Sequence, residues 1–134
     1  MGKMQREKGK RGERMWARKC REYGYAVRRT SQYCGQTGEA ADCVGIPGIH
    51  QEVKFVERLN IQDAMDQAVR DAKNERNGNI PIVAHKRSDC EWLVTMRADD
   101  WFTILREWES GMVLDHMEDN QNESKRIDQT TRKM

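Results

Sequence analysis

The chain has 134 residues, of which 34% are charged and 37% are hydrophobic. This length allows one domain with a small core, and the composition is that of a soluble protein. The longest uncharged apolar run, residues 80–84, is far too short to span a bilayer. The Lys/Arg-rich N-terminus contains no apolar segment, so we do not expect a secretory signal there. We therefore expect a cytoplasmic protein that does not enter a membrane.

The cysteines argue against a zinc site. They lie at positions 20, 34, 43 and 90, and none of them forms a C-x-x-C pair. Zinc sites built on cysteine need ligands at close, regular spacing. We interpret these residues as reduced and mostly buried thiols, which fits a cytoplasmic protein.

The net charge of +2 is unevenly distributed. Residues 1–30 contain eleven Lys or Arg and three Glu, whereas the rest of the chain carries an excess of acidic residues. A basic segment on a more acidic body is typical of a protein that binds a polyanion such as nucleic acid. The alternative is a solvated tail without a partner.

The chain begins with a segment, residues 1–8, that we predict to be a basic and flexible arm. From Gly9 to Tyr23 the apolar residues recur at helical spacing. Glu13 falls in line with this apolar stripe, near the first turn of the helix. Either the helix dipole alone favours a carboxylate there, or Glu13 has a role in a site.

Three strands are predicted next. Residues 25–30 form the first strand, and residues 31–39, which include two glycines and no aliphatic side chain, form a flexible loop. The runs 40–46 and 49–56 form a hairpin around Pro47-Gly48.

The second half of the chain alternates helices and strands. Asn60 caps the clearest amphipathic helix, which ends near Asn77-Gly78. Residues 80–84 are predicted to be a strand buried on both faces, and residues 92–96 another strand.

A last helix begins at Asp99 or Asp100. Its apolar face, which includes Trp101 and Trp108, is predicted to be core, and Gly111 is a stop signal. Residues 111–134 are predicted to be a polar, disordered tail. The predicted folded domain thus spans residues 9–110. The fold class is α/β, a central mixed five-stranded sheet flanked by helices in the order α-β-β-β-α-β-β-α.

The third strand carries an unusual alternation. Ile49, Val53 and Phe55 fall on one face, whereas His50, Glu52 and Lys54 fall on the other. A carboxylate and an ammonium two residues apart on one face indicate either a cross-strand salt bridge on a solvated face or a functional site.

Asp42, in the partner strand, decides between these interpretations through the hairpin register. A two-residue loop places Asp42 opposite Val53, on the other face. A three-residue loop, residues 46–48, places Asp42 opposite Glu52 and suits Gly48 at its left-handed last position. In the second register two carboxylates lie close together and repel each other unless a cation lies between them.

An all-oxygen site of this kind suits Mg²⁺ or Mn²⁺ better than zinc. The expected reaction is hydrolysis of a phosphodiester, in which the metal neutralises the phosphate and activates water. Lys54 lies on the same face, where a cation favours an anionic substrate.

The spacing of Asp42 and Glu52-Val53-Lys54 resembles the PD-(D/E)xK nuclease signature. The surrounding pattern is similar to that of Holliday junction resolvases of the archaeal and phage type, in the helix start from Gly9 to Glu13-Arg14 and in the strand from Tyr23 to Arg29. The resemblance implies a restriction-endonuclease-like fold. Ala41 departs from the motif, which usually has Pro before the aspartate.

Site residues follow from this resemblance. Glu13, Asp42 and Glu52 would bind the metal together with the backbone carbonyl of Val53. Lys54 would be the catalytic lysine, assisted by Gln67 from the following helix. The triplet Glu123-Ser124-Lys125 also fits Glu-x-Lys, but it lies in the predicted tail and shows that the bare triplet is weak evidence.

The predicted substrate is DNA, most specifically a four-way junction cut by a homodimer. The predicted DNA contacts are Lys3, Lys8, Lys10, Arg11, Arg14, Arg28, Arg29, Thr30, Ser31 and Lys86. His50 is a weaker candidate for a substrate contact, with a histidine of no role as the alternative. Two rival functions remain: another nuclease of the same fold acting in restriction, repair or on single strands, and a non-catalytic nucleic-acid-binding protein.

Overall fold

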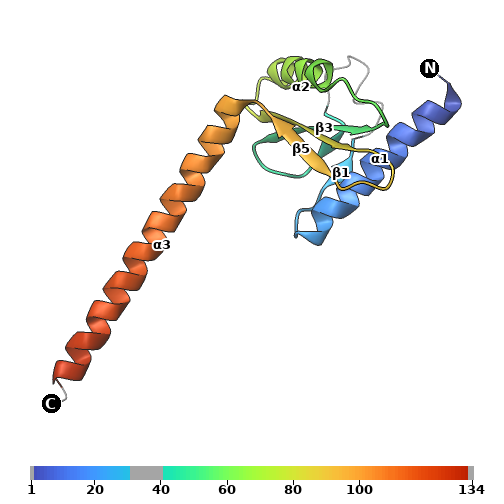
Figure 1. Cartoon of the computed structure of the whole chain (residues 1–134). Coiled ribbons are helices and arrows are strands. Elements are labelled where there is room, and N and C mark those ends of the chain that lie inside the picture. Colours follow the sequence, from blue (N-terminus) through green and yellow to red (C-terminus); the bar gives the residue numbers. More distant parts are fainter. Residues whose placement is uncertain (1, 31–40, 133–134) are drawn as a thin grey trace. The chain divides into compact units, whose positions relative to one another are not determined.

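The computed structural model describes residues 2–30 and 41–132. The chain divides into two compact units, residues 1–97 and 98–134 (Figure 1). The predicted loop at residues 31–39 lies outside the described residues. No helix in the described part of the chain is long and apolar enough to cross a membrane.

The first unit is a five-stranded mixed sheet between two helices (Figure 1). Its elements are α1 (Lys3–Glu22), β1 (Arg28–Arg29), β2 (Cys43–Val44), β3 (Ile49–Phe55), α2 (Ile61–Glu75), β4 (Ile80–Lys86) and β5 (Leu93–Met96). The strand order is β1-β2-β3-β4-β5, with β3 and β4 parallel and every other pair antiparallel. The second unit holds α3 (Ala98–Arg132). The predicted fold and element order are confirmed.

The hairpin between β2 and β3 has the register expected for the three-residue loop. Cys43 pairs with Gln51, so Asp42 lies opposite Glu52. Gly48, the last loop residue, has φ +78, a left-handed conformation that favours glycine. The predicted register is therefore correct.

Helix α1 covers one face of the sheet. Trp16, Ala17 and Cys20 pack with Val27, Cys43, Val53, Ile82 and Ala84. Trp16 Nε1 donates to the buried Gln51 Oε1 at 2.8 Å. Gly12 lies against Phe55, where an added Cβ would be 2.5 Å from the Cβ of Phe55. The absence of a side chain at Gly12 thus lets α1 approach β3.

Helix α2 covers the other face. Asn60 caps it as predicted, since its Oδ1 accepts from the Asp63 N–H at 3.1 Å. Ala64, Met65 and Ala68 pack against Val83 of β4. Pro81 to Ala84 are all buried, as expected for a strand covered on both faces. Because β3 and β4 are the inner strands of this sandwich, polar groups on β3 are shielded from water.

Several predicted boundaries differ from the structure. The predicted flexible arm is largely helical, because α1 begins at Lys3. The first two strands are short, with two residues each. Of the thiols, Cys20 and Cys43 are buried as predicted and Cys90 is exposed. The residue at position 34 lies outside the described part of the chain.

The predicted tail is also different. Helix α3 continues through Gly111 to Arg132, so residues 111–132 are helical and the units divide after Arg97. One glycine within a helix disfavours it by only about 1 kcal/mol, and the Glu, Gln, Met and Leu residues around it favour helix.

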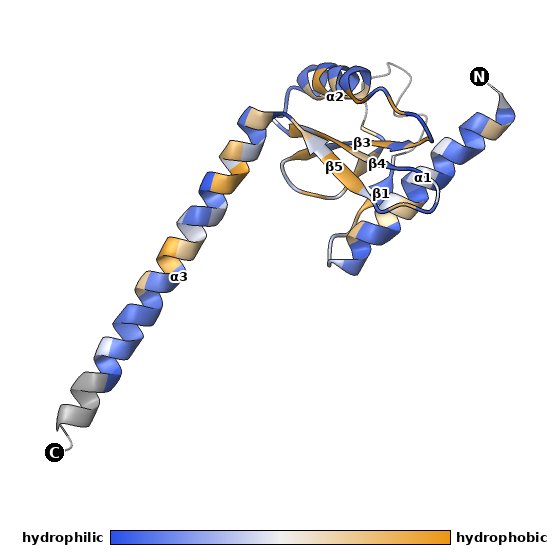
Figure 2. Cartoon of the chain, in the orientation of Figure 1, coloured by the Kyte–Doolittle hydropathy of each residue, from blue (hydrophilic) through white to orange (hydrophobic). Residues whose placement is uncertain are grey.

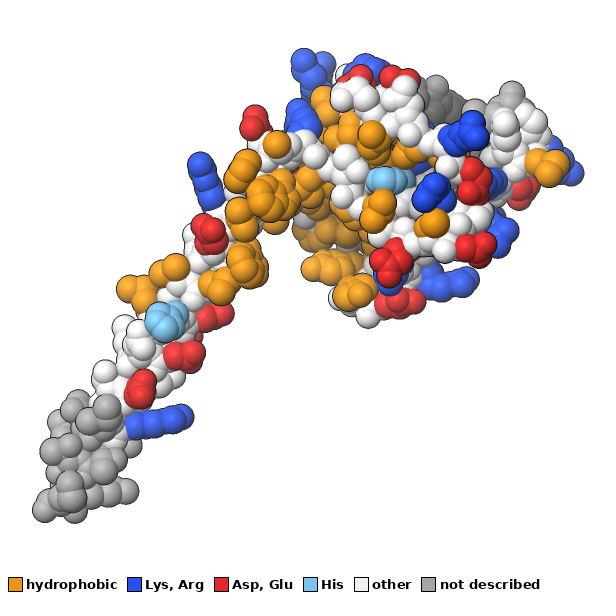
Figure 3. All heavy atoms as spheres, in the orientation of Figure 1, with side chains coloured by type: hydrophobic (Ala, Val, Ile, Leu, Met, Phe, Trp, Pro, Cys, Tyr) orange, Lys and Arg blue, Asp and Glu red, His pale blue; other side chains and the backbone are white. Residues whose placement is uncertain are grey.

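The apolar face of α3 is exposed, contrary to its predicted burial. Trp101 and Trp108 are 49% and 61% exposed. Figure 2 colours several residues in the first half of α3 as hydrophobic and mostly hydrophilic ones beyond them, and Figure 3 shows hydrophobic side chains along the first half. These tryptophans therefore do not belong to the core of the described chain.

Candidate active site

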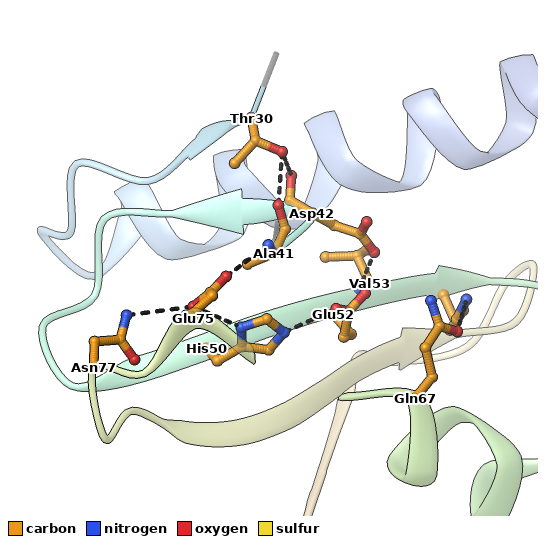
Figure 4. A network of polar contacts seen from close by, with 10 residues as sticks. Thr30, Ala41, Asp42, His50, Glu52, Val53, Gln67, Glu75 and Asn77 are labelled. Carbon is orange, nitrogen blue, oxygen red and sulfur yellow. Dashed lines mark hydrogen bonds and ion pairs between the residues drawn. The ribbon is translucent and has the colours of Figure 1, made fainter. Parts of the chain in front are cut away.

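Asp42 and Glu52 are brought together by the β2–β3 hairpin. The Asp42 N–H donates to the Gln51 carbonyl at 2.9 Å, which continues the ladder past β2. The Asp42 carboxylate Oδ2 accepts from the Val53 N–H at 2.8 Å, so this side chain lies against β3 (Figure 4). Glu52 is only 1% exposed. A salt bridge on a solvated face is thereby excluded.

The electrostatics of this pair are unfavourable without a cation. Burial, followed by the neighbouring Glu52 carboxylate, raises the pKa of Asp42 to about 7. The N–H of Val53 and the charge of Lys54 oppose this shift only in part. Two carboxylates in this arrangement suit a divalent cation with oxygen ligands.

Glu13 reaches the same region from α1. Burial raises the pKa of Glu13, the hydrogen bond from Arg29 opposes that shift, and the Asp42 charge raises the pKa further. Arg29 forms a half-buried ion pair with Glu13. The Cys43 thiol contacts the Glu13 carbonyl at 3.6 Å, which ties α1 to β2. Glu13 and Glu52 therefore each interact electrostatically with Asp42.

Lys54 lies next to Glu52 on the polar face of β3. Its Nζ donates to Gln67 Oε1 of α2 at 3.3 Å. The structure thus brings Lys54 and Gln67 together, the two residues that the sequence resemblance assigned to one site.

Three further residues belong to this region. His50 is 1% exposed; its Nε2 lies 2.8 Å from Glu52 Oε1, and its Nδ1 lies 3.1 Å from Glu75 Oε2. Burial lowers the pKa of His50, but the contacts with Glu52 and Glu75 outweigh burial and raise it overall. His50, Glu52 and Asp71 also place one ligand atom each within 4.8 Å of one another.

Glu75 connects the two carboxylates indirectly (Figure 4). Its Oε1 accepts from the Ala41 N–H at 3.0 Å, directly before Asp42, while its Oε2 contacts His50. Thr30 donates to the Ala41 carbonyl at 2.7 Å. This network fixes the chain directly before Asp42. It also engages the hydroxyl proton of Thr30, which was predicted to contact phosphate.

The polar stripe of α2 is the sequence signal for these residues. Gln67, Asp71 and Glu75 lie four positions apart and therefore share one helix face. The resemblance pointed to Gln67 alone on this stripe, so the sequence did not predict the roles of Asp71 and Glu75.

The predicted DNA contacts separate into groups. A groove of about 880 Å³ runs along α1, and its basic lining residues are Lys3, Lys8, Arg11, Arg14 and Lys86. Phe55 forms its floor, with Lys8 Nζ 4.9 Å and Lys86 Nζ 5.8 Å from the ring centroid. Glu7 and Asp89 are its acidic lining residues. This groove therefore brings together several of the predicted DNA contacts.

The other predicted contacts lie elsewhere. Lys10 is not among the residues that line the groove, and Arg28 is exposed on β1. Arg29 is held by Glu13, so its first role is structural. Ser31 lies outside the described residues.

Comparison with known proteins gives a distant likeness. No family model matches the chain, and no curated protein matches it. Among solved structures, the chain is similar to a Holliday junction resolvase from Archaeoglobus fulgidus, an archaeal hyperthermophile. The two chains are 25% identical, the match covers 66% of this chain and 72% of the other, and the TM-score is 0.49.

Proposed function

We propose that this protein is a metal-dependent endonuclease that hydrolyses DNA phosphodiester bonds. The observation that carries the proposal is the arrangement of Asp42 opposite Glu52, with Lys54 two residues further along β3. The two carboxylates need a cation, and the lysine needs an anion. A metal ion and a phosphate satisfy both requirements together.

Asp42, Glu52 and Glu13 would hold Mg²⁺ or Mn²⁺, with the Val53 carbonyl as a further oxygen ligand. The bound ion would neutralise the phosphate and lower the pKa of the attacking water. The residues fit this ion, because burial and mutual repulsion already make Asp42 a poor isolated anion. A neighbouring divalent charge would stabilise its ionised form.

Lys54 would act on the phosphate rather than on the metal, because an ammonium has no lone pair to offer. Gln67 accepts a hydrogen bond from Lys54 Nζ and so limits the directions in which the ammonium points. Held in this way, Lys54 would stabilise the charge that develops on the phosphate oxygens.

DNA would lie in the groove along α1. This helix carries both Glu13 of the site and the basic groove residues, so one rigid element would link the bound DNA to the site. Phosphate contacts of this kind position the substrate without reading sequence. Selectivity would then depend on the shape of the DNA, which favours a branched substrate such as a four-way junction.

Symmetric cleavage of a junction needs two sites related by a two-fold axis, so we propose a homodimer. The exposed apolar side chains of α3, which include Trp101, Trp108 and Met112, offer a surface for a second copy. In the Trp108→Glu variant, the mass measured by light scattering should fall from that of a dimer to that of a monomer. A dimeric mass in the variant would assign the interface elsewhere.

The experiment that tests the function is incubation of the purified protein with labelled single strand, duplex, fork and four-way junction, in Mg²⁺ and in EDTA. Symmetric cuts in the junction alone would support a resolvase. Preferential cutting of another substrate would support a different nuclease. Binding without cutting in Mg²⁺ or Mn²⁺ would support the non-catalytic alternative.

A further inference from the structure

Helix α2 and strand β3 face each other through three pairs of polar side chains. Lys54 contacts Gln67, and His50 contacts Glu75 at the other end. Between them, Glu52 lies close to Asp71. The paired residues are four positions apart on α2 and two positions apart on β3. Four helical residues rise about 6.0 Å and two strand residues about 6.6 Å, so residues at these spacings remain opposite each other over three pairs.

The middle pair differs from the outer two because both of its members are acids. Asp71 is 8% exposed, and among the described residues it has neither a hydrogen bond nor an ion pair with another side chain. A buried carboxylate without a partner is strongly disfavoured. Its position beside the fully buried Glu52 makes the arrangement less favourable still.

The charges around this pair do not balance. Glu52, Asp71 and Glu75 are three carboxylates around one imidazole. A protonated His50, which lies between Glu52 and Glu75, and Lys54, which donates to Gln67, supply at most two positive charges against these three carboxylates. Asn77, which donates to Glu75 at 3.3 Å, is neutral. A divalent cation would supply the missing positive charge.

We propose that His50, Glu52 and Asp71 form a second divalent-metal site, distinct from the one proposed at Asp42. Their ligand atoms lie within 4.8 Å of one another, close to the separation of up to about 4.4 Å expected for ligands about 2.2 Å from one ion. An imidazole nitrogen with two carboxylates suits Mn²⁺ better than Mg²⁺, which prefers oxygen ligands and water.

Glu75 orients the histidine for this task. Its Oε2 lies 3.1 Å from Nδ1, and the other ring nitrogen, Nε2, lies 2.8 Å from Glu52 Oε1. A carboxylate on the second ring nitrogen is the usual partner of a metal-binding histidine. Glu52 has two carboxylate oxygens, so it can bind one ion at the Asp42 site and another at the His50–Asp71 site. Only this double role of Glu52 rests on the proposed nuclease function.

The test is a Mn²⁺ titration followed by electron paramagnetic resonance, on the full-length protein and on single variants. The wild type should bind two ions, and Asp71→Asn should bind one. The nitrogen coupling from an imidazole ligand should be present in the wild type and lost in His50→Gln. Asp66→Asn, an exposed change on the same helix, should bind two ions.

The melting temperature of the metal-free protein tests whether Asp71 has only a structural role. Asp71→Asn removes an unpaired buried charge at constant shape, so it should melt at the same or a higher temperature than the wild type. A lower melting temperature would make Asp71 a counter-charge for His50 and overturn the proposal. So would two bound ions in Asp71→Asn, or an unchanged nitrogen coupling in His50→Gln.

The same titration separates this proposal from the nuclease site. If Asp42→Asn still binds two ions while Asp71→Asn binds one, the site at Asp71 stands and the site at Asp42 fails. If Asp42→Asn abolishes all Mn²⁺ binding while Asp71→Asn changes none, the second site fails and the nuclease site stands.

Discussion

Asp42 lies opposite Glu52 across the β2–β3 hairpin, and both carboxylates are turned away from bulk water. Neither solvation nor a matched positive charge compensates fully for this proximity. Keeping two acids in this position lowers the stability of the folded state. Ionisable groups with perturbed pKa values of this kind are common at functional sites. The first and the fifth of the predictions below concern this pair directly.

The first prediction concerns pH. The pKa of Asp42 is about 7 in the folded protein, above its ordinary value of 3.8, so the folded state binds the extra proton between these values. Stability of the metal-free protein should therefore be greatest at acid pH and fall as pH rises through 7, by at most about 4 kcal/mol. His50, whose pKa is also raised, acts in the same direction.

Denaturant unfolding between pH 5 and 8 measures this effect. Asp42→Asn should flatten the profile, and saturating Mg²⁺ should also flatten it, because the ion stabilises the ionised carboxylate. A metal-free wild type that becomes more stable from pH 5 to 8 would contradict the assignment.

The second prediction separates Lys54 from Gln67. Lys54→Ala should lower the single-turnover cleavage rate by about 10²-fold or more, as expected for loss of a group that stabilises transition-state charge. Gln67→Ala should have a smaller effect, because the ammonium remains and loses only its orientation. Both variants should retain Mg²⁺ binding.

Lys125→Ala provides the matched control for Lys54, since it removes the lysine of the other Glu-x-Lys triplet. Its cleavage rate should equal that of the wild type. If Lys54→Ala loses metal binding as well as activity, Lys54 supports the site structurally rather than acting on phosphate.

The third prediction concerns the groove. Arg11→Gln or Lys86→Gln should weaken DNA binding and make the log–log salt dependence shallower by up to about 0.9 per lost phosphate contact. Arg70→Gln removes the same charge from the exposed face of α2 and should change the slope little. Equal slopes for all three variants would place the DNA outside the groove.

The fourth prediction concerns the close approach of α1 to β3. Gly12→Ala places a Cβ 2.5 Å from Phe55 Cβ and should destabilise the fold by about 1–3 kcal/mol. Gly9→Ala, in the same helix but with open space at its Cβ, should stabilise it by up to about 1 kcal/mol. Urea unfolding of both variants checks the difference, and a stable Gly12→Ala would show that α1 can shift.

Local rules were sufficient for much of the fold. Asn60 marked the start of α2, and the apolar run from Ile80 marked a buried strand. The left-handed preference of Gly48 set the hairpin register, and with it the meeting of Asp42 and Glu52. Each of these depends on residues near one another in the chain, and that is why the sequence was enough to predict them.

What the sequence did not predict depends on distant contacts. His50 became a buried residue only because β4 pairs with β3 in parallel and α2 covers both strands. Asp71 and Glu75 lie on a polar stripe that resembles a solvated helix face until β3 is placed against it. The exposure of Trp101 could not be inferred from its apolar spacing, because spacing identifies a face and not the partner that covers it.

The most direct test of the central claim, and the fifth prediction, is cleavage of a labelled four-way junction in Mg²⁺ by the wild type, Asp42→Asn, Glu52→Gln and the control Glu123→Gln. The wild type and Glu123→Gln should cut at equal rates. Asp42→Asn and Glu52→Gln should bind the junction in Ca²⁺ with wild-type affinity and leave it uncut in Mg²⁺. Cleavage by either variant at a rate near that of the wild type would contradict the account.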